Sequence, residues 1–506
     1  MNTQGNLRKS AYNLLYSLVY QIVMIAMGLI LPRVILVGFG SQINGLLNSV
    51  AQAIAYMVLF EAGIQSAATK SLYAALAKGN RAAINSVLAA VHRCYRRVGI
   101  LYFAGLLGLS IAYPWFVRLE ELTYFQVFLI ILFSGMGNVV AFFKQAKYRI
   151  LLCADGREYM ITNLNTVTSM ISNALKIVLL SLHIQVHVVI ALTFFVSLIH
   201  VACVECYVRR NYGWIDLDMM EDHDALKQSK YAFIHQFSGL VFSNTDMILL
   251  TIFCDLKAVS VYAVYKLIVG HISSLIATSF HSCSFALGQL FNLDREKYIK
   301  SLDGIQAGFG VLVFSILTVT YLLLPSFMGI YTSGVTDAFY VDRYLPVLFV
   351  AAEVLHLIRI PVMHTINSCA GHFQETLPRT LMETWINLVV SIVGVRVWGI
   401  YGVLIGTIAA LMYRSVDFVV YANREILMRS PAKNLLLYGV NIGTMLALSA
   451  MLGKANMSIT TYSQFCFCGL IITLPVMLIY LMVNVCFFRK DFAYLLHGCI
   501  KGRAKD

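Results

Sequence analysis

The sequence predicts an all-α protein that crosses a membrane many times, with about fourteen spanning helices. Hydrophobic residues make up 59% of the 506 residues and charged residues only 12%, and the mean hydropathy is +0.75. Long apolar stretches recur along the chain, and about 20 apolar residues in a helix cross ~30 Å of hydrocarbon. Because Lys and Arg gather in every second polar joint, the stretches indicate successive crossings in alternating directions.

Each predicted span is a run of mainly apolar residues bounded by short polar joints. In chain order the spans are 13–36, 45–64, 98–117, 123–143, 159–182, 188–208, 233–254, 259–290, 303–325, 345–368, 380–396, 400–421, 435–453 and 464–488. The alanine-rich segment 65–97 carries Lys and Arg throughout and predicts an amphipathic helix on the inner membrane surface. None of the joints is long enough for a soluble catalytic domain.

The distribution of the 38 Lys and Arg residues predicts which side of the membrane each joint occupies. If the N-terminus lies inside, all but nine fall on inner joints; the nine are Arg33, Arg118, Lys176, Lys257, Lys266, Arg343, Arg359, Arg396 and Lys454. The positive-inside rule therefore predicts that both termini are cytoplasmic. The net charge of +13 follows from this topology and from attraction to anionic headgroups, and it does not indicate a nucleic-acid partner.

A polar linker near residues 215–230 divides the chain into two similar halves. Six spans precede it, six follow, and two more close the chain. We therefore expect an N-terminal six-helix lobe at 1–215, a C-terminal six-helix lobe at 216–430, and two additional transmembrane helices with a cytoplasmic tail at 431–506. Two lobes of the same orientation predict a pseudo-two-fold axis along the membrane normal, with the substrate path between the lobes.

Several motifs spread over the whole chain resemble one family. They are Gly40-Ser-Gln-Ile-Asn-Gly45 after Arg33, Glu61-Ala-Gly-Ile64, Ser243-Asn-Thr-Asp-Met-Ile-Leu-Leu250, Tyr331-Thr-Ser-Gly-Val-Thr-Asp-Ala338 and Gly399-Ile-Tyr-Gly-Val-Leu-Ile-Gly406. With these motifs the chain resembles the Wzx-type polysaccharide flippases of the multidrug/oligosaccharidyl-lipid/polysaccharide (MOP) exporter superfamily.

The resemblance implies a MATE-like, V-shaped transporter of two six-helix bundles in the bacterial cytoplasmic (inner) membrane. It implies alternating access that turns polyprenyl-diphosphate-linked oligosaccharide from the inner to the outer leaflet for surface polysaccharide biosynthesis. The expected partners are that glycan, membrane lipids, H⁺ or Na⁺ as the coupling ion, and polysaccharide assembly proteins. We expect no enzymatic activity, cofactor, bound metal or nucleic acid.

Cationic residues inside the spans are the first candidates for substrate binding, because a charge in the bilayer is costly unless it has a function. They are Arg33, Lys176, Lys266 and Arg359, whose ammonium and guanidinium groups suit phosphate oxygens. For Arg33 the structural alternative is snorkelling to the outer surface, and for Lys266 it is neutralisation of an acidic neighbour. We expect Arg33, Lys266 and Arg359 to face one water-accessible space between the lobes.

Acidic and histidine residues inside the spans are candidates for ion coupling or cavity lining. They are Glu61, Asp246, His271, Glu353 and His356. Glu353 and His356 lie three residues apart and so share one face of their helix. The structural alternatives are an ion pair of Glu61 with a nearby lysine, interhelical hydrogen bonding by Asp246, and neutralisation of Glu353 by Arg359. Three charged residues nearer the inner ends of spans 380–396 and 400–421 are assigned ordinary interfacial positions; they are Glu383, Arg414 and Asp417.

Two other functions compete with the flippase. A cation-coupled multidrug exporter of the same superfamily is expected to have an acidic cavity, whereas the central charged residues here are net positive. A membrane-embedded polysaccharide polymerase or glycosyltransferase usually carries a larger outer loop or paired acidic residues at the membrane face, which this sequence lacks. The flippase is the predicted function, with the sugar composition left open.

Overall fold

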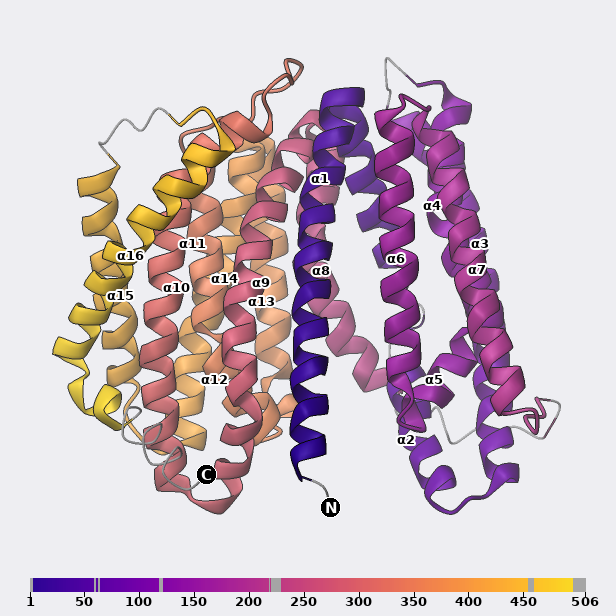
Figure 1. Cartoon of the computed structure of the whole chain (residues 1–506), viewed down its shortest axis with the longest axis horizontal. Helices are drawn as coiled ribbons and strands as arrows, with labels where there is room; N and C mark the ends of the chain where they lie inside the picture. Colours follow the sequence, from indigo (N-terminus) through magenta and orange to yellow (C-terminus); the bar gives the residue numbers. More distant parts are fainter. Residues whose placement is uncertain are drawn as a thin grey trace. The chain divides into compact units, whose positions relative to one another are not determined.

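The computed structural model of the protein consists of long helices (Figure 1). It describes residues 3–58, 61, 64–117, 122–217, 219, 229–453 and 459–494. Within these residues, twelve helices are long and apolar enough to cross a membrane. The predicted all-α polytopic fold is confirmed, and the protein is a multi-pass membrane protein.

The predicted spans coincide with helices, but not always one to one. Helix α1 (Thr3–Val58) contains the first predicted span and most of the second, separated by a kink. Helix α8 (Ser229–Phe253) contains the seventh, of which Asn244–Phe253 is a described apolar segment too short to count among the twelve. The helices therefore follow the predicted spans, and fourteen stays an approximate count.

The helices form two compact units, Met1–Ser260 and Val261–Asp506. Unit 1 contains α1, α2 (Ile64–Ala77), α3 (Arg81–Phe116), α4 (Tyr124–Lys144), α5 (Ala146–Ala154), α6 (Glu158–Ser181), α7 (Val186–Asn211), α8 and the first residues of α9 (Leu256–Leu293). Helix α8 packs on α1 within this unit. Most of the predicted linker 215–230 lies outside the described residues, so the lobe boundary at 215 stays a prediction.

Two positions at the start of the second predicted span require glycine, one for its backbone conformation and one for a close contact between helices. Gly40 adopts φ 79°, a value that favours glycine, and this residue makes the kink in α1. At Gly45 an added Cβ would lie 1.8 Å from the Leu256 carbonyl oxygen, so the backbones of α1 and α9 meet there. Asn44 Nδ2 donates a 2.7 Å hydrogen bond to Ser260 Oγ beside this contact. Together these residues fix the second half of α1 against the start of α9.

The segment 65–97 is helical, as predicted, but it folds as two helices; its place on the inner membrane surface stays a prediction. Helix α2 ends at Ala77, and Asn80 caps α3 by accepting a 3.1 Å hydrogen bond from the Ala83 N–H. Helix α3 then continues without a break into the third predicted span. Leu72 and Leu88 are fully buried, so both helices pack into the core of unit 1.

Unit 2 contains the rest of α9 and the C-terminal helices. These are α10 (Arg295–Tyr331), α11 (Leu345–Ile358), α12 (Ile360–His364), the π-helix η3 (Thr365–Cys369), α13 (Phe373–Trp398), α14 (Ile400–Tyr421), the π-helix η4 (Ala422–Ile426), α15 (Ala432–Leu452) and α16 (Tyr462–Phe487). The tenth predicted span is thus broken at Arg359, just before Pro361, which cannot donate an intrahelical hydrogen bond.

Helices α15 and α16 pack along α10 (Figure 1). At one end, Asp303 of α10 accepts hydrogen bonds of 2.7 and 2.8 Å from Arg429 and one of 2.8 Å from Lys433. Lys433 also donates to Asp491 at 2.8 Å. Because Asp303 is buried, its two cationic partners are needed to offset the cost of removing a carboxylate from water.

Candidate functional site

A cavity of about 790 Å³ lies inside unit 1. Its walls come mainly from α1, α4, α6 and α7. Small-molecule sites in proteins are typically about 300–1,000 Å³ and combine an apolar wall with a few placed polar groups. The cavity therefore has the size of a ligand site, and its polar residues decide which ligand it suits.

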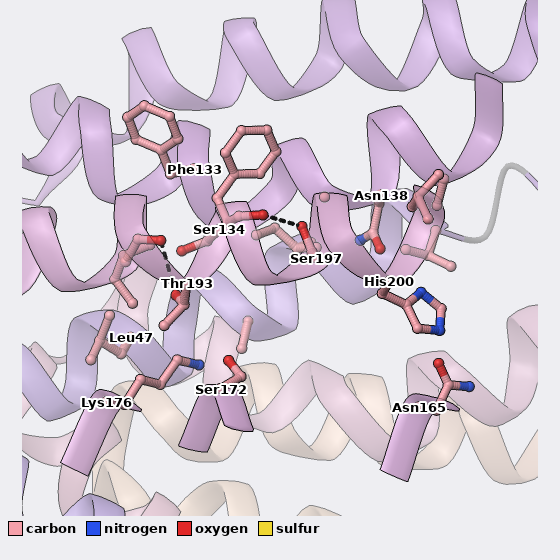
Figure 2. A pocket seen from close by; sticks show the side chains of 18 of the residues that line it. Leu47, Phe133, Ser134, Asn138, Asn165, Ser172, Lys176, Thr193, Ser197 and His200 are labelled. Carbon is pink, nitrogen blue, oxygen red and sulfur yellow. Dashed lines mark hydrogen bonds between the residues drawn. The ribbon is translucent and has the colours of Figure 1, made fainter. Parts of the chain in front are cut away.

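One polar stripe in the cavity comes from α6 (Figure 2). Asn165, Ser172 and Lys176 are seven and four residues apart, which places them on one helix face. Among the described residues, Lys176 Nζ has no hydrogen-bond or ion-pair partner. The surrounding protein removes this group from water. A desolvated ammonium group is stable only with compensating polar contacts. The cavity thus presents a cation ready for a polar or anionic ligand.

A second set of polar groups faces this stripe from α4 and α7 (Figure 2). Thr193 and Ser197 donate to carbonyl oxygens of their own helix at 2.9 and 2.6 Å, which leaves their oxygen lone pairs as acceptors. Asn138 donates to Tyr102 at 3.1 Å. His200 Nε2 is buried without a hydrogen-bond partner among the described residues. Such hydroxyl, amide and imidazole groups can bind a polyhydroxyl solute.

A third group lies where the cavity approaches α2 and α5, which pack together in unit 1 (Figure 1). Glu61 follows α1, and the Tyr95 hydroxyl of α3 donates a hydrogen bond to its carboxylate. Arg149 of α5 lies within electrostatic range of Glu61. The charges of Glu61 and Arg149 therefore offset one another inside the cavity.

Two of the nine predicted site residues, Lys176 and Glu61, line this cavity. Arg33 does not line it. Asp246 is buried on α8 at 2% exposure and acts electrostatically on Tyr56 of α1. Its place beside α1 fits the alternative of contact between helices.

The remaining predicted residues lie in unit 2. Glu353 of α11 is within electrostatic range of Lys266 of α9 and of Arg359. The Lys266 ammonium lies 5.6 Å from the centre of the Tyr262 ring, a cation–π distance. His271 is half-buried, and its Nε2 has no hydrogen-bond partner among the described residues. The structure thus brings the charged residues of α9 and α11 together.

Arg359 has a partner that sequence reasoning misses. Its Nη1 lies 2.6 Å from Glu383 Oε1 of α13. Glu383 Oε2 lies 3.4 Å from Arg414 Nε, and Arg414 pairs with Asp417 at 2.8 Å. The residues assigned to ordinary interfacial positions therefore form a buried ionic chain across α13 and α14. The three-residue spacing of Arg414 and Asp417 within α14 indicates one link. No spacing indicates the links through Glu383, because those partners come from different helices.

His356 lies on the same face as Arg359, as the three-residue spacing predicts. Its Nδ1 is 3.2 Å from Arg359 Nη2. Among the described residues, no three His, Cys, Asp or Glu side chains form a group that could hold a metal ion.

Sequence reasoning also misses Asn165 and Ser172 in the unit 1 cavity. Their spacing to Lys176 is the signal that finds them.

No protein-family model and no curated protein matches the sequence. The structure is similar to the lipid II flippase MurJ in an inward closed conformation, with a TM-score of 0.69 and 13% identity over 93% of this chain and 99% of that one. It is also similar to an inward-facing multidrug resistance transporter of the MATE family, with a TM-score of 0.58 and 13% identity over 83% of this chain and 96% of that one. The chain has the fold shared by MurJ and this MATE transporter.

This fold confirms the MATE-like architecture that the resemblance implied, while membership of the MOP superfamily stays a prediction. The Wzx-type subclass also stays a prediction. Because one fold serves transporters of unlike solutes, such as MurJ and the MATE protein, the cargo of this chain must be argued from its own residues.

Proposed function

We propose that this protein is a flippase of the MOP superfamily for polyprenyl-diphosphate-linked oligosaccharide. It moves the glycan from the inner to the outer leaflet of the bacterial cytoplasmic membrane by alternating access, for surface polysaccharide biosynthesis, and it catalyses no covalent step. The observation that carries the proposal is the ligand-sized cavity of unit 1, whose wall combines Lys176 with hydroxyl and amide groups. Hydroxyls and amides both donate and accept hydrogen bonds, as the many hydroxyls of a glycan require.

The similarity to MurJ supports a lipid-linked cargo. MurJ is a lipid II flippase, and the similarity covers 99% of its chain. A lipid-linked glycan has a polar head that needs a polar cavity and a tail that remains in hydrocarbon. The many large apolar side chains exposed along the helices of both units, such as Ile171 and Leu474, suit contact with lipid.

The similarity to the MATE transporter favours a second candidate, a cation-coupled multidrug exporter. Lys176 argues against organic cations as its cargo. Within a protein the effective dielectric constant is lower than in bulk water and like charges repel more strongly, so the lysine disfavours a cationic drug. The flippase accounts for the lysine, and the exporter does not.

Orientation and coupling belong to the same proposal. Both termini lie in the cytoplasm, and an H⁺ or Na⁺ gradient drives the cycle through Glu61, Asp246, His271, Glu353 or His356. The predicted substrate cations Arg33, Lys266 and Arg359 contact the diphosphate, and polysaccharide assembly proteins bind the transporter at the membrane. The ionic surroundings of Glu353, with Lys266 and Arg359 in range, support a carboxylate whose proton affinity changes when a cation moves away.

A gene deletion in the source bacterium tests the function. The deletion should abolish surface polysaccharide and cause lipid-linked oligosaccharide to accumulate in the inner leaflet, and the intact gene should restore export. Unchanged polysaccharide together with increased drug sensitivity would support the multidrug exporter instead. Loss of polysaccharide without accumulated precursor would indicate an earlier, biosynthetic step.

A further inference from the structure

The charge of the unit 1 cavity follows from a small number of residues. The ionisable side chains among its described lining residues are Glu61, Tyr95, Arg149, Lys176 and His200. Glu61 and Arg149 offset one another, and Tyr95 donates to Glu61 as a neutral phenol. The buried Nε2 of His200 has no partner, so a second proton on the ring would be an unpaired buried charge. With Lys176 protonated, the form that a bound anion favours, the net charge is therefore one positive charge, located on Lys176.

This balance discriminates between the two anionic groups that a lipid-linked acidic glycan can offer. A diphosphate diester carries two negative charges, so one would remain uncompensated beside Lys176. A sugar carboxylate carries one negative charge, which Lys176 matches. Buried charges are stable when paired, and an unmatched one is strongly unfavourable.

The surroundings of Lys176 suit a sugar ring. Ser172 lies one helical turn from Lys176 on α6, and the hydroxyl of Thr193 faces them from α7 (Figure 2). The acceptors and donors that surround the ammonium group are neutral. Among the described lining residues, an arginine fork, which would bind phosphate oxygens in a bidentate way, is present only at Arg149, which Glu61 neutralises.

We propose that the unit 1 cavity binds a carboxylate-bearing sugar residue, of the uronic acid type, with its carboxylate on Lys176 and its hydroxyls on the polar groups of α6 and α7. The carrier diphosphate then lies outside this cavity. The inference rests on the proposed function and narrows the cargo to acidic oligosaccharides.

Binding to the purified full-length protein in lipid nanodiscs tests the proposal by titration calorimetry. The probes are a glucuronic-acid-containing disaccharide, the methyl ester of the same disaccharide, and inorganic pyrophosphate. The acid should bind about 10-fold or more tightly than the ester, because a charge-assisted hydrogen bond is stronger than a neutral one. Lys176→Met should remove the preference and Lys176→Arg should retain it. Lys144→Met, at an exposed lysine of α4 outside the cavity, should behave as wild type.

Two results overturn the proposal. One is equal binding of acid and ester by the wild-type protein, a comparison that needs no variant to fold. The other is Lys176-dependent binding of pyrophosphate that is tighter than binding of the acid.

Proteoliposomes separate this inference from the proposed function. With an acidic and a neutral lipid-linked oligosaccharide supplied in turn, faster translocation of the acidic one supports both. Equal translocation of the two leaves the flippase standing and removes the carboxylate site. Translocation of neither removes the flippase, while the titration still decides what the cavity binds.

Discussion

Arg359, at the end of α11, forms a direct ion pair with Glu383 of α13, with 2.6 Å between Nη1 and Oε1. The two side chains are only 11% and 9% exposed. An anionic substrate that reaches Arg359 must therefore compete with a carboxylate already in place. Within unit 2 the pair joins the broken tenth predicted span to α13, so Arg359 has a structural role beside any role in binding.

Glu383→Gln should destabilise the protein markedly. The change leaves Arg359 and Arg414 without their shared carboxylate, and breaking one side of a buried pair typically costs ~3–5 kcal/mol. Thermal unfolding of the purified protein measures the effect. Glu296→Gln is the matched control, because Glu296 is 79% exposed in its pair with Lys300 and exposed pairs contribute ~0–1 kcal/mol. Equal stability of the two variants would show that Glu383 is not the partner of these arginines.

Gly402→Ala should destabilise the α13–α14 contact by ~1–3 kcal/mol, the usual cost of overpacking. An added Cβ would lie 2.0 Å from the Gly394 carbonyl oxygen of the facing helix, and a backbone atom cannot move aside as a flexible side chain can. Gly443→Ala on α15 meets nothing within 4 Å and serves as control. A fall in Tm for Gly402→Ala alone is the predicted result, and a Tm at the wild-type value would contradict the close approach.

Asp342, in the loop before α11, should make the free energy of unfolding fall at acid pH. Burial acts to raise the pKa of the Asp342 carboxyl, but hydrogen bonds from Tyr401 and from the Leu345 and Tyr344 N–H groups outweigh it and hold that pKa below its ordinary value. A carboxyl with a lowered folded-state pKa contributes stability that is complete above its unfolded pKa, about 3.9, and is lost as the pH falls through its folded pKa.

Asp342→Asn should therefore remove part of the fall in Tm between about pH 5 and pH 3. Asp337→Asn, an exposed site in the same loop, should keep the wild-type profile. Thermal unfolding across this pH range gives both curves. An unchanged profile in Asp342→Asn would mean that these hydrogen bonds do not stabilise the folded state.

The positive-inside partition predicts the sidedness of the chain. Reporter fusions after Lys433 should read as cytoplasmic, and fusions after Asp337, in the long joint before α11, should read as external. Paired reporters active on opposite sides of the membrane provide the measurement. A stable fusion after Lys433 that reads as external would show that the number of preceding spans is odd.

Much of the fold was predictable because spanning helices can be recognised in a sequence by the length and apolarity of their segments. Span 123–143, for example, coincides with α4 (Tyr124–Lys144) almost to the residue. The length of α3 was not predictable, because its first half carries several Arg residues as a surface helix would. The apolar side chains between them, such as Leu88, are buried by contacts that include α2 and lie outside any local pattern.

The site was predictable in part. Lys176 is found from the cost of a charge in a span. Asn165 and Ser172 are neutral, so that cost does not identify them, and only their spacing to Lys176 does. Arg359 is found for the same reason as Lys176, yet its partner Glu383 lies in another helix. Pairing between helices depends on packing, which one sequence without its structure does not specify.

Translocation by the purified protein in proteoliposomes tests the central claim most directly. A fluorescent lipid-linked acidic oligosaccharide is placed in both leaflets, and a membrane-impermeant quencher added outside reports how much label becomes accessible over time. The flippase account predicts protein-dependent quenching of more than the half of the label that starts in the outer leaflet. The Lys176→Met protein should quench more slowly, and the Lys144→Met protein should behave as wild type. The rate should respond to an imposed H⁺ or Na⁺ gradient. Quenching that stops at the same level as in protein-free liposomes would contradict it.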